Sequence, residues 1–342
     1  MSNMPPILVT LYTLATGFAG AALGYWLSAP IYVLIGPAVL ISLLSLTGIR
    51  FAIADQVRDV AFLVIGIGIG SGVNSDVTAA LLHWPLAFVT LAISLLAIML
   101  ACRFVPSRVF GLDHRSAVMA STPGHLSFVL SMSAVMDLDL PNIIVIQSIR
   151  LLVMTLIVPF AALFFGFEVG GNIFPPGTPI DLLHLAPLVA ASFVAGLILK
   201  RFNVPAAMLM GAMIVSVTTH LTELTPGTLS PEIAFAAFVT LGTLIGTRFS
   251  GISLTQLKSS ALAGLTTTLI SAAIAALAAV PIAMTLGMPM AHVLVAFAPG
   301  GFETMVAMGV VLGASPGFVA ACHVVRLLVL PVLVPIVLGR RK

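Results

Sequence analysis

Hydrophobic residues form long runs, with few polar breaks, along nearly the whole chain. In the first half, six apolar runs cover residues 7–27, 31–49, 60–73, 81–105, 117–136 and 143–165. Six more follow in the second half, at residues 182–199, 206–221, 233–249, 259–286, 290–312 and 318–338. A helix of about 20 apolar residues is long enough to cross the hydrocarbon core of a bilayer. The pattern therefore predicts an all-α polytopic membrane protein.

The second half of the chain repeats landmarks of the first. The step Pro123-Gly124 recurs as Pro299-Gly300, and Arg150 recurs as Arg326, both at the same offset along the chain. Other landmarks recur in the same order, at that offset or one position less: Pro30 as Pro205, Gly36 as Gly211, Gly66 as Gly242, Gly70 as Gly246, and Pro159 as Pro335. We predict a first repeat at residues 1–165, a Gly- and Pro-rich linker at 166–180, and a second repeat at 181–342.

The distribution of basic residues indicates how the repeats cross the membrane. If runs 117–136 and 290–312 enter the bilayer and return on the same side, 12 of the 14 lysines and arginines share one side. These are Arg50, Arg58, Arg103, Arg108, Arg115, Lys200, Arg201, Arg248, Lys258, Arg340, Arg341 and Lys342. The positive-inside rule then favours two inverted repeats, each with five transmembrane helices and one re-entrant hairpin, and both termini in the cytoplasm. Twelve spans with broken helices are the alternative, because such runs can also cross once.

Composition narrows the function classes. Hydrophobic residues make up 60% of the chain and charged residues only 7%, against about 25% charged in soluble domains. The net charge is +3, but the basic residues form no patch, which argues against nucleic acid as a partner. Cys102 and Cys322 give neither a disulfide framework nor a metal spacing. The sequence therefore predicts no cofactor, no metal site and no enzyme, and the glycines of run 60–73 fit close helix packing.

The two Pro-Gly steps interrupt apolar segments and are the first candidate for a binding site. Proline lacks a backbone N–H, and glycine adopts conformations that other residues avoid. A helix that restarts after such a break presents free N–H groups and a positive dipole end, which favour an anion. The candidate substrate-binding residues are Ser121, Thr122, Pro123, Gly124, His125 and Ser127 in the first copy, and Pro299, Gly300, Gly301 and Thr304 in the second. The alternative is a proline kink without a ligand.

Arg150 and Arg326 lie well inside apolar runs. An arginine at the centre of a membrane helix costs about 2.5–3.5 kcal/mol on insertion scales, so it must find partners in the protein interior. One interpretation is a counter-charge for a carboxylate. The other is a structural tie to the carbonyls freed at the breaks, or to Glu303. Gln147 and His323 precede the arginines by one helical turn and share their face, so we add them to the site.

Glu303 is the acidic residue that lies well inside an apolar run, and it follows the second break. It is a candidate carrier of a coupling proton or sodium ion, or else a member of a fixed ion pair. His125 takes the place of Gly301 in the first copy and is the second ion-coupling candidate, because histidine titrates near neutrality. Ser127 stands opposite Glu303, so the two copies differ here, as expected if one copy binds the coupling ion.

The two segments, Ser121-Thr122-Pro123-Gly124-His125 through Arg150 and Ala298-Pro299-Gly300-Gly301-Phe302-Glu303 through Arg326, resemble bacterial AbrB-type duplicated membrane proteins over nearly the whole chain. Members have been labelled both transcriptional regulators and ammonia monooxygenases. This sequence offers neither a DNA-binding element nor a His-rich copper or di-iron site. More loosely, the breaks are similar to those of bile-acid/sodium symporters, and the order of segments to citrate and glutamate sodium symporters. That likeness implies an elevator motion and a homodimer.

The sequence as a whole predicts a secondary transporter of a small anionic solute. The binding site is expected where the Pro-Gly breaks meet near the midplane of the lipid bilayer, in a bacterial inner membrane. Transport is expected to be coupled to a proton or to sodium. A membrane-embedded ligand sensor that regulates gene expression is the first alternative, and an oxidoreductase is the second.

Overall fold

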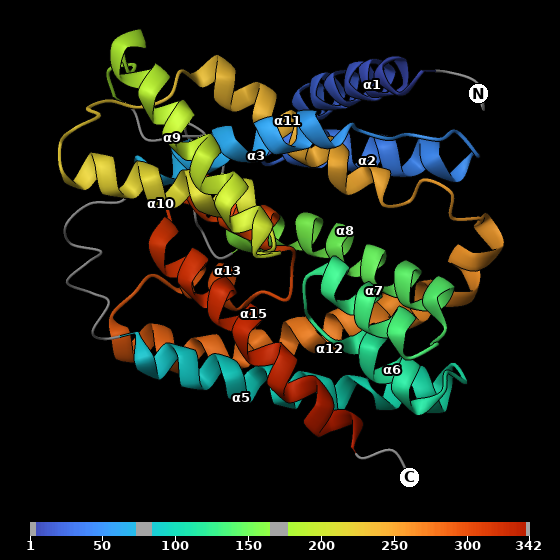
Figure 1. The fold of residues 1–342 in the computed structure, drawn as a ribbon. Helices are drawn as coiled ribbons and strands as arrows, with labels where there is room; N and C mark the ends of the chain where they lie inside the picture. The colour runs from blue at the N-terminus through green and yellow to red at the C-terminus, as the bar shows by residue number, and fades with distance from the viewer. Residues whose placement is uncertain (1–4, 73–83, 165–176, 340–342) are drawn as a thin grey trace. The chain divides into compact units, whose positions relative to one another are not determined.

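A computed structural model of the chain describes residues 5–72, 84–164 and 177–339 (Figure 1). Within these residues there are fourteen α-helices and no β-strand, which confirms the all-α prediction. Most of the predicted linker at 166–180 lies outside the described residues, as do Arg340, Arg341 and Lys342.

The helices follow the predicted apolar runs. The first half contains α1 (Pro6–Trp26), α2 (Tyr32–Leu46), α3 (Asp55–Gly70), α5 (Pro85–Cys102), α6 (His114–Ser121), α7 (Leu126–Val135) and α8 (Leu140–Phe164). The second half contains α9 (Leu182–Arg201), α10 (Ala207–Leu221), α11 (Pro231–Thr247), α12 (Leu254–Leu286), α13 (Met290–Phe297), α14 (Phe302–Val311) and α15 (Pro316–Leu338). In the part of the chain that the structure describes, six helices are long and apolar enough to cross a membrane, namely α1, α5, α8, α9, α12 and α15. The protein is a polytopic membrane protein.

Polar residues between the apolar runs set where helices begin. The carboxylate of Asp113 accepts the backbone N–H groups of Arg115 and Ser116 and caps α6. Ser253 and Gln256 form a capping box at the start of α12. Each cap satisfies N–H groups that have no partner inside the helix, which fixes the first turn.

The same order of elements recurs along the chain. Helices α13 and α14 repeat α6 and α7 at one constant offset and with the same lengths, and α10 likewise has the same length as α2. Even an unusual backbone conformation recurs, since Ile31 and Ala206 precede α2 and α10 with φ angles of 46° and 51°. The duplicated sequence thus folds into duplicated local structure. The inversion of the repeats across the membrane stays a prediction.

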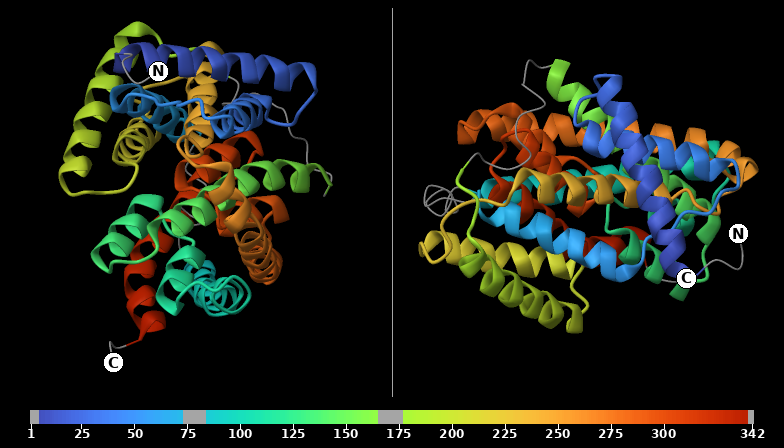
Figure 2. Two further views of the ribbon diagram at one scale, coloured as in Figure 1. Left: turned by 90° about the vertical axis from the view of Figure 1, so that its right-hand side faces the viewer. Right: turned by 90° about the horizontal axis from the view of Figure 1, so that it is seen from above.

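The helices form two compact units, and each unit takes segments from both halves of the chain. The first unit comprises Met1–Ala80, Pro159–Gly251 and Val306–Gly317, and the second comprises Leu81–Val158, Ile252–Met305 and Phe318–Lys342. In the first unit α9 packs along α10, and in the second α5 packs along α12 (Figure 2). The sequence repeats and the compact units are therefore different divisions of the same chain.

Close packing in the first unit explains two glycines. Helix α3 packs on α10, and its counterpart α11 packs on α2. A Cβ atom on Gly66 would lie 2.3 Å from the carbonyl oxygen of Leu209, and one on Gly242 would lie 2.5 Å from that of Leu34. Only glycine fits such contacts between backbones. The packing interpretation of the glycines in run 60–73 is confirmed for Gly66.

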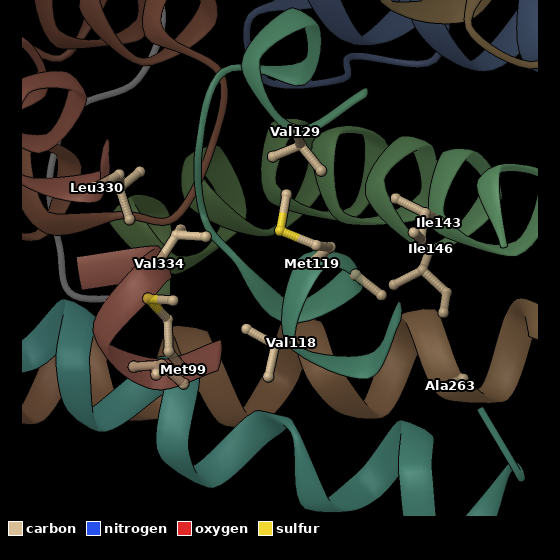
Figure 3. Packing of buried hydrophobic residues seen from close by; sticks show 11 residues of the cluster. Met99, Val118, Met119, Val129, Ile143, Ile146, Ala263, Leu330 and Val334 are labelled. Atoms are coloured by element: carbon tan, nitrogen blue, oxygen red, sulfur yellow. The ribbon is translucent and has the colours of Figure 1, made fainter. Parts of the chain in front are cut away.

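The core of the second unit includes residues of both short helices that flank the first Pro-Gly break (Figure 3). It joins buried residues of α5, α6, α7, α8, α12 and α15: Met99, Val118, Met119, Ala120, Val129, Ile143, Ile146, Ala263, Leu330, Val334 and Val337. Burial of this size holds the short helices α6 and α7 against longer ones, because neither could form a stable helix alone. The break is therefore fixed by packing on several sides.

Candidate functional site

The segment that contains the first break folds back on itself. Helices α6 and α7 have 8 and 10 residues, so each is roughly 12–15 Å long, too short to cross a core of about 30 Å. The hydroxyl oxygen of Ser116, near the start of α6, accepts the backbone N–H of Asp139, beyond the end of α7, at 3.1 Å. Both ends of the segment lie together, as in a hairpin. A broken spanning helix would separate them by the thickness of the bilayer.

Arg150 binds the backbone of the first break. From α8, its Nη1 donates to the carbonyl oxygen of Thr122 at 2.7 Å, and its Nη2 donates to that of Gly124 at 3.2 Å. The residue is only 3% exposed. These two carbonyls flank Pro123, where the helix has lost its regular hydrogen bonds. These contacts are the ones that the structural-tie interpretation of this arginine predicts.

Gln147 completes the same arrangement one turn earlier on α8. Its side-chain nitrogen donates to the carbonyl oxygens of Met119, Ala120 and Thr122, at 3.0 Å in each case. These oxygens belong to the end of α6, which has no further turn to donate to them. The amide of Gln147 is therefore a side-chain cap for α6, while its Oε1 atom is buried with no hydrogen-bond partner among the described residues.

The hydroxyl groups of Ser121 and Thr122, predicted to bind substrate at the first break, donate hydrogen bonds to the backbone instead. Ser121 donates to the carbonyl oxygen of Ala117 at 2.7 Å, and Thr122 donates to that of Val118 at 2.8 Å. Both residues are buried, whereas Ser127 is exposed on α7. The backbone N–H of Ser127 faces Nδ1 of His125 at 3.3 Å, so this histidine caps α7. The structure thus spreads these candidates over the hairpin instead of converging their hydroxyls on one point.

Arg326 makes a different set of contacts at the second break. From α15, its Nη2 donates to the carbonyl oxygens of Phe297 at 3.1 Å and Ala296 at 3.5 Å, at the end of α13. The residue is 2% exposed. Its Nε and Nη1 atoms are buried, and no hydrogen-bond acceptor for them is found in the described part of the chain. Nε of Arg150 likewise has no partner among these residues, so the two arginines differ in Nη1, which Arg150 uses for the backbone and Arg326 does not.

His323 explains the difference between the two arginines. Its Nδ1 faces the carbonyl oxygen of Val319 in its own helix at 3.0 Å, so it does not reach the end of α13. Its ring packs edge-on against Phe302, with centroids 6.2 Å apart. Arg326 binds the end of α13 instead, and one of its two carbonyls, that of Ala296, corresponds to the Ala120 carbonyl that Gln147 binds in the first copy. The Nε2 atom of His323 is buried and has no partner in the residues the structure covers.

One contact joins the two breaks directly. Nε2 of His125 lies 3.3 Å from Oε1 of Glu303, and both side chains are slightly exposed, at 16% and 15%. Glu303 and Thr304 lie in the first turn of α14, directly after Gly301. The sequence suggests both ionisable residues as coupling candidates but not their contact, because 178 residues separate them. No local pattern could have revealed this pair.

The second unit thus concentrates positive charge in its interior. Arg150 and Arg326 are close enough for their charges to repel each other. Their hydrogen bonds described above all go to neutral carbonyls. A search of the described residues finds no group of three His, Cys, Asp or Glu side chains that could hold a metal ion. The arrangement is suited to binding an anion through hydrogen bonds and charge.

Comparisons with known proteins agree with the resemblance noted in the sequence. The family described as "Transition state regulatory protein AbrB" matches residues 33–340. The chain is also 26% identical over 293 residues to the "Uncharacterized protein YhjN" of Bacillus subtilis (strain 168), across 80% of this chain and 75% of that protein. Because the family match spans most of the sequence, the chain belongs to the AbrB family.

Proposed function

We propose that this protein is a secondary transporter of a small organic anion. The observation that carries the proposal is the pair of buried arginines in the second unit, of which Arg326 keeps N–H donors without acceptors among the described residues. A buried charge of this kind is expensive in a membrane protein unless it serves a ligand or a fixed partner. An anion that reaches the arginines supplies both the missing charge and the missing acceptors.

The helices that restart after the breaks support the same ligand class. Helices α7 and α14 begin at Leu126 and Phe302, directly after the two Pro-Gly steps. Their first N–H groups and the positive ends of their dipoles favour negative charge. In transporters built from repeats, such interrupted helices form the substrate site near the bilayer midplane. We place the anion there, with Gly301 and Thr304 at its second contact point.

The contact between His125 and Glu303 is the proposed coupling site. A histidine and a carboxylate at 3.3 Å can share a proton, and a carboxylate can also bind sodium. Because the pair joins the two breaks, a change in its charge would alter how the breaks sit against each other. We further propose that the protein acts as a homodimer in a bacterial inner membrane, with both termini in the cytoplasm.

Flux into proteoliposomes tests this function. The purified protein is reconstituted, and uptake of labelled carboxylates is followed under an imposed proton or sodium gradient. We expect accumulation of at least one carboxylate that depends on one gradient and is lost in Arg326→Ala. Absence of flux for every carboxylate under both gradients, with correctly folded protein, would contradict the transporter proposal.

A membrane-embedded sensor is the second candidate, and the family description "Transition state regulatory protein AbrB" is the observation that favours it. A sensor would bind the same anion at the same arginines without moving it across the bilayer. Saturable binding together with zero flux in the same preparation would support the sensor over the transporter.

A further inference from the structure

The arginine motif consists of Arg150 and Gln147 in the first copy and of Arg326 and His323 in the second. The two copies differ in how many hydrogen-bond donors have no acceptor among the described residues. In the first copy, both Nη atoms of Arg150 donate to the break, and the amide nitrogen of Gln147 donates to three carbonyls. In the second copy, a single nitrogen of Arg326 binds the backbone. Its Nε and Nη1 carry three N–H bonds. These donors are buried without an acceptor in the described residues, whereas Arg150 leaves only its Nε in this state. The second copy is therefore the more open one, by the Nη1 group of Arg326.

His323 adds an acceptor next to these donors. A carbonyl oxygen only accepts hydrogen bonds, so the contact with Val319 places the ring proton on Nδ1. A second proton on Nε2 would create a positive charge beside Arg326, which lies three residues further along α15. Burial of both residues makes such repulsion costly. Nε2 therefore carries a lone pair that can accept a hydrogen bond.

Donors and an acceptor thus stand one helical turn apart on the same face of α15. Residues three positions apart on a helix are neighbours, so one small ligand can reach both. A simple carboxylate would satisfy the N–H groups of Arg326 but would leave Nε2 of His323 unpaired. A carboxylate with a hydroxyl group on the adjacent carbon would satisfy both, because that group donates a hydrogen bond and carries no charge.

We propose that the substrate is a small 2-hydroxycarboxylate. Arg326 binds its carboxylate, and His323 selects the neighbouring donor group. The first copy, with Arg150 and Gln147, serves to hold the broken helix in shape. This inference rests on the proposed anion site and adds to it the chemical class of the ligand and a residue that determines specificity.

Matched pairs of ligands test the selection. Binding of lactate and propionate, and of malate and succinate, is measured by calorimetry on the purified full-length protein. Members of each pair differ in one hydroxyl group. We expect the hydroxy acid to bind about 10-fold more tightly, the effect of about one buried hydrogen bond. In His323→Met, which removes the acceptor but remains apolar and of similar size, this preference should disappear while both acids still bind.

Two further variants separate selection from folding. His323→Gln places in the second copy the residue that the first copy has, with an oxygen that can accept, and should retain a preference for the hydroxy acid. Gln147→Met should lower the thermal stability and leave the preference unchanged. A His323→Met protein with the wild-type preference overturns the inference, as does a wild type that binds both members of each pair equally. In either case a bound carboxylate leaves the anion proposal standing, whereas binding of no carboxylate overturns both.

Discussion

The first and second copies of the arginine motif have nearly the same backbone and different hydrogen bonding. Helices α6, α7 and α8 recur as α13, α14 and α15, with their first residues at a constant offset. Yet Arg150 binds the carbonyls that flank Pro123, whereas Arg326 binds those at the end of α13. The change of Gln147 to His323 accounts for this, because an amide can cap the preceding helix and this histidine binds its own. Duplication preserves packing, while one polar substitution redirects a neighbouring charge.

A second difference lies in the residues that follow the breaks. The first copy has His125 and Ser127 where the second has Gly301 and Glu303. The contact between His125 and Glu303 therefore has no symmetric counterpart, since Gly301 and Ser127 cannot form an ion pair. Polar residues that differ between the copies meet in space. This is the arrangement expected if one ligand or ion binds asymmetrically within a duplicated scaffold.

The largest expected effect separates the two arginines. Arg150→Ala removes two charge-assisted hydrogen bonds and takes from the carbonyl of Gly124 the donor that Arg150 supplies, whereas the carbonyl of Thr122 keeps Gln147. We therefore expect a loss of about 3 kcal/mol in unfolding free energy. Arg326→Ala should lose only about half as much, because a single nitrogen binds the backbone and a repulsion is relieved, but it should abolish anion binding. Thermal unfolding in detergent measures the first effect and calorimetry the second. Equal destabilisation by both variants would contradict the comparison.

Loss of coupling is the next effect in size. Glu303→Gln removes the charge of the proposed coupling pair and keeps its shape. We expect this variant to bind the anion, to lose gradient-driven accumulation, and to show a flatter dependence of uptake on pH. Ser127→Ala, at the equivalent position of the first copy, is the matched control and should transport normally. Unchanged accumulation in Glu303→Gln would remove this residue from the mechanism and leave His125 as the candidate.

The topology of the two hairpins gives an intermediate test. In an inverted repeat, the first hairpin opens to the cytoplasm and the second to the periplasm. Asp139→Cys should therefore react with a membrane-impermeant maleimide only from the cytoplasmic side. Its counterpart Ser315→Cys should react only from the periplasmic side. Labelling of both from one side would show that the repeats are parallel.

The smallest effect concerns an ion-pair network that one copy has and the other lacks. Asp59, at the start of α3, contacts Lys200 and Arg58 at 2.8 Å each, whereas the equivalents of Asp59 and Lys200 are Phe235 and Tyr25. Burial raises the pKa of Asp59, but the hydrogen bonds and charges of Lys200 and Arg58 outweigh it, and the net pKa is lowered.

A carboxylate with a lowered pKa stabilises the fold above its unfolded pKa, about 4, and loses this contribution as pH falls through the folded value. Because Lys200 is 53% exposed, we expect Asp59→Asn to cost only about 0.5 kcal/mol at pH 7. The difference from wild type should shrink as pH falls through the lowered pKa of Asp59 and vanish below it. Thermal unfolding between pH 3 and pH 7 measures it. A constant difference would show that the network is not the cause.

Local sequence patterns determined most of the helical architecture of this protein. Hydropathy over a window of about 20 residues predicts a membrane helix because each apolar side chain contributes independently of distant residues. The Pro-Gly steps likewise fixed where the predicted run 117–136 splits into α6 and α7, because proline and glycine act on their own backbone. The equal offsets of helix bounds follow from the same local rules applied twice.

Only the tertiary structure decided what the buried polar groups do. The sequence leaves Arg150 open between a ligand contact and a structural tie, since both satisfy a buried guanidinium equally well. The hydrogen bonds of each arginine depend on which carbonyls the preceding polar residue already binds. Gln147 binds the end of α6, whereas His323 binds its own helix. The contact between His125 and Glu303 likewise forms only in the folded protein, because 178 positions separate the two residues along the chain. Hydrogen bonding is short-ranged and directional, so its partners are set by packing in three dimensions and not by spacing along the chain.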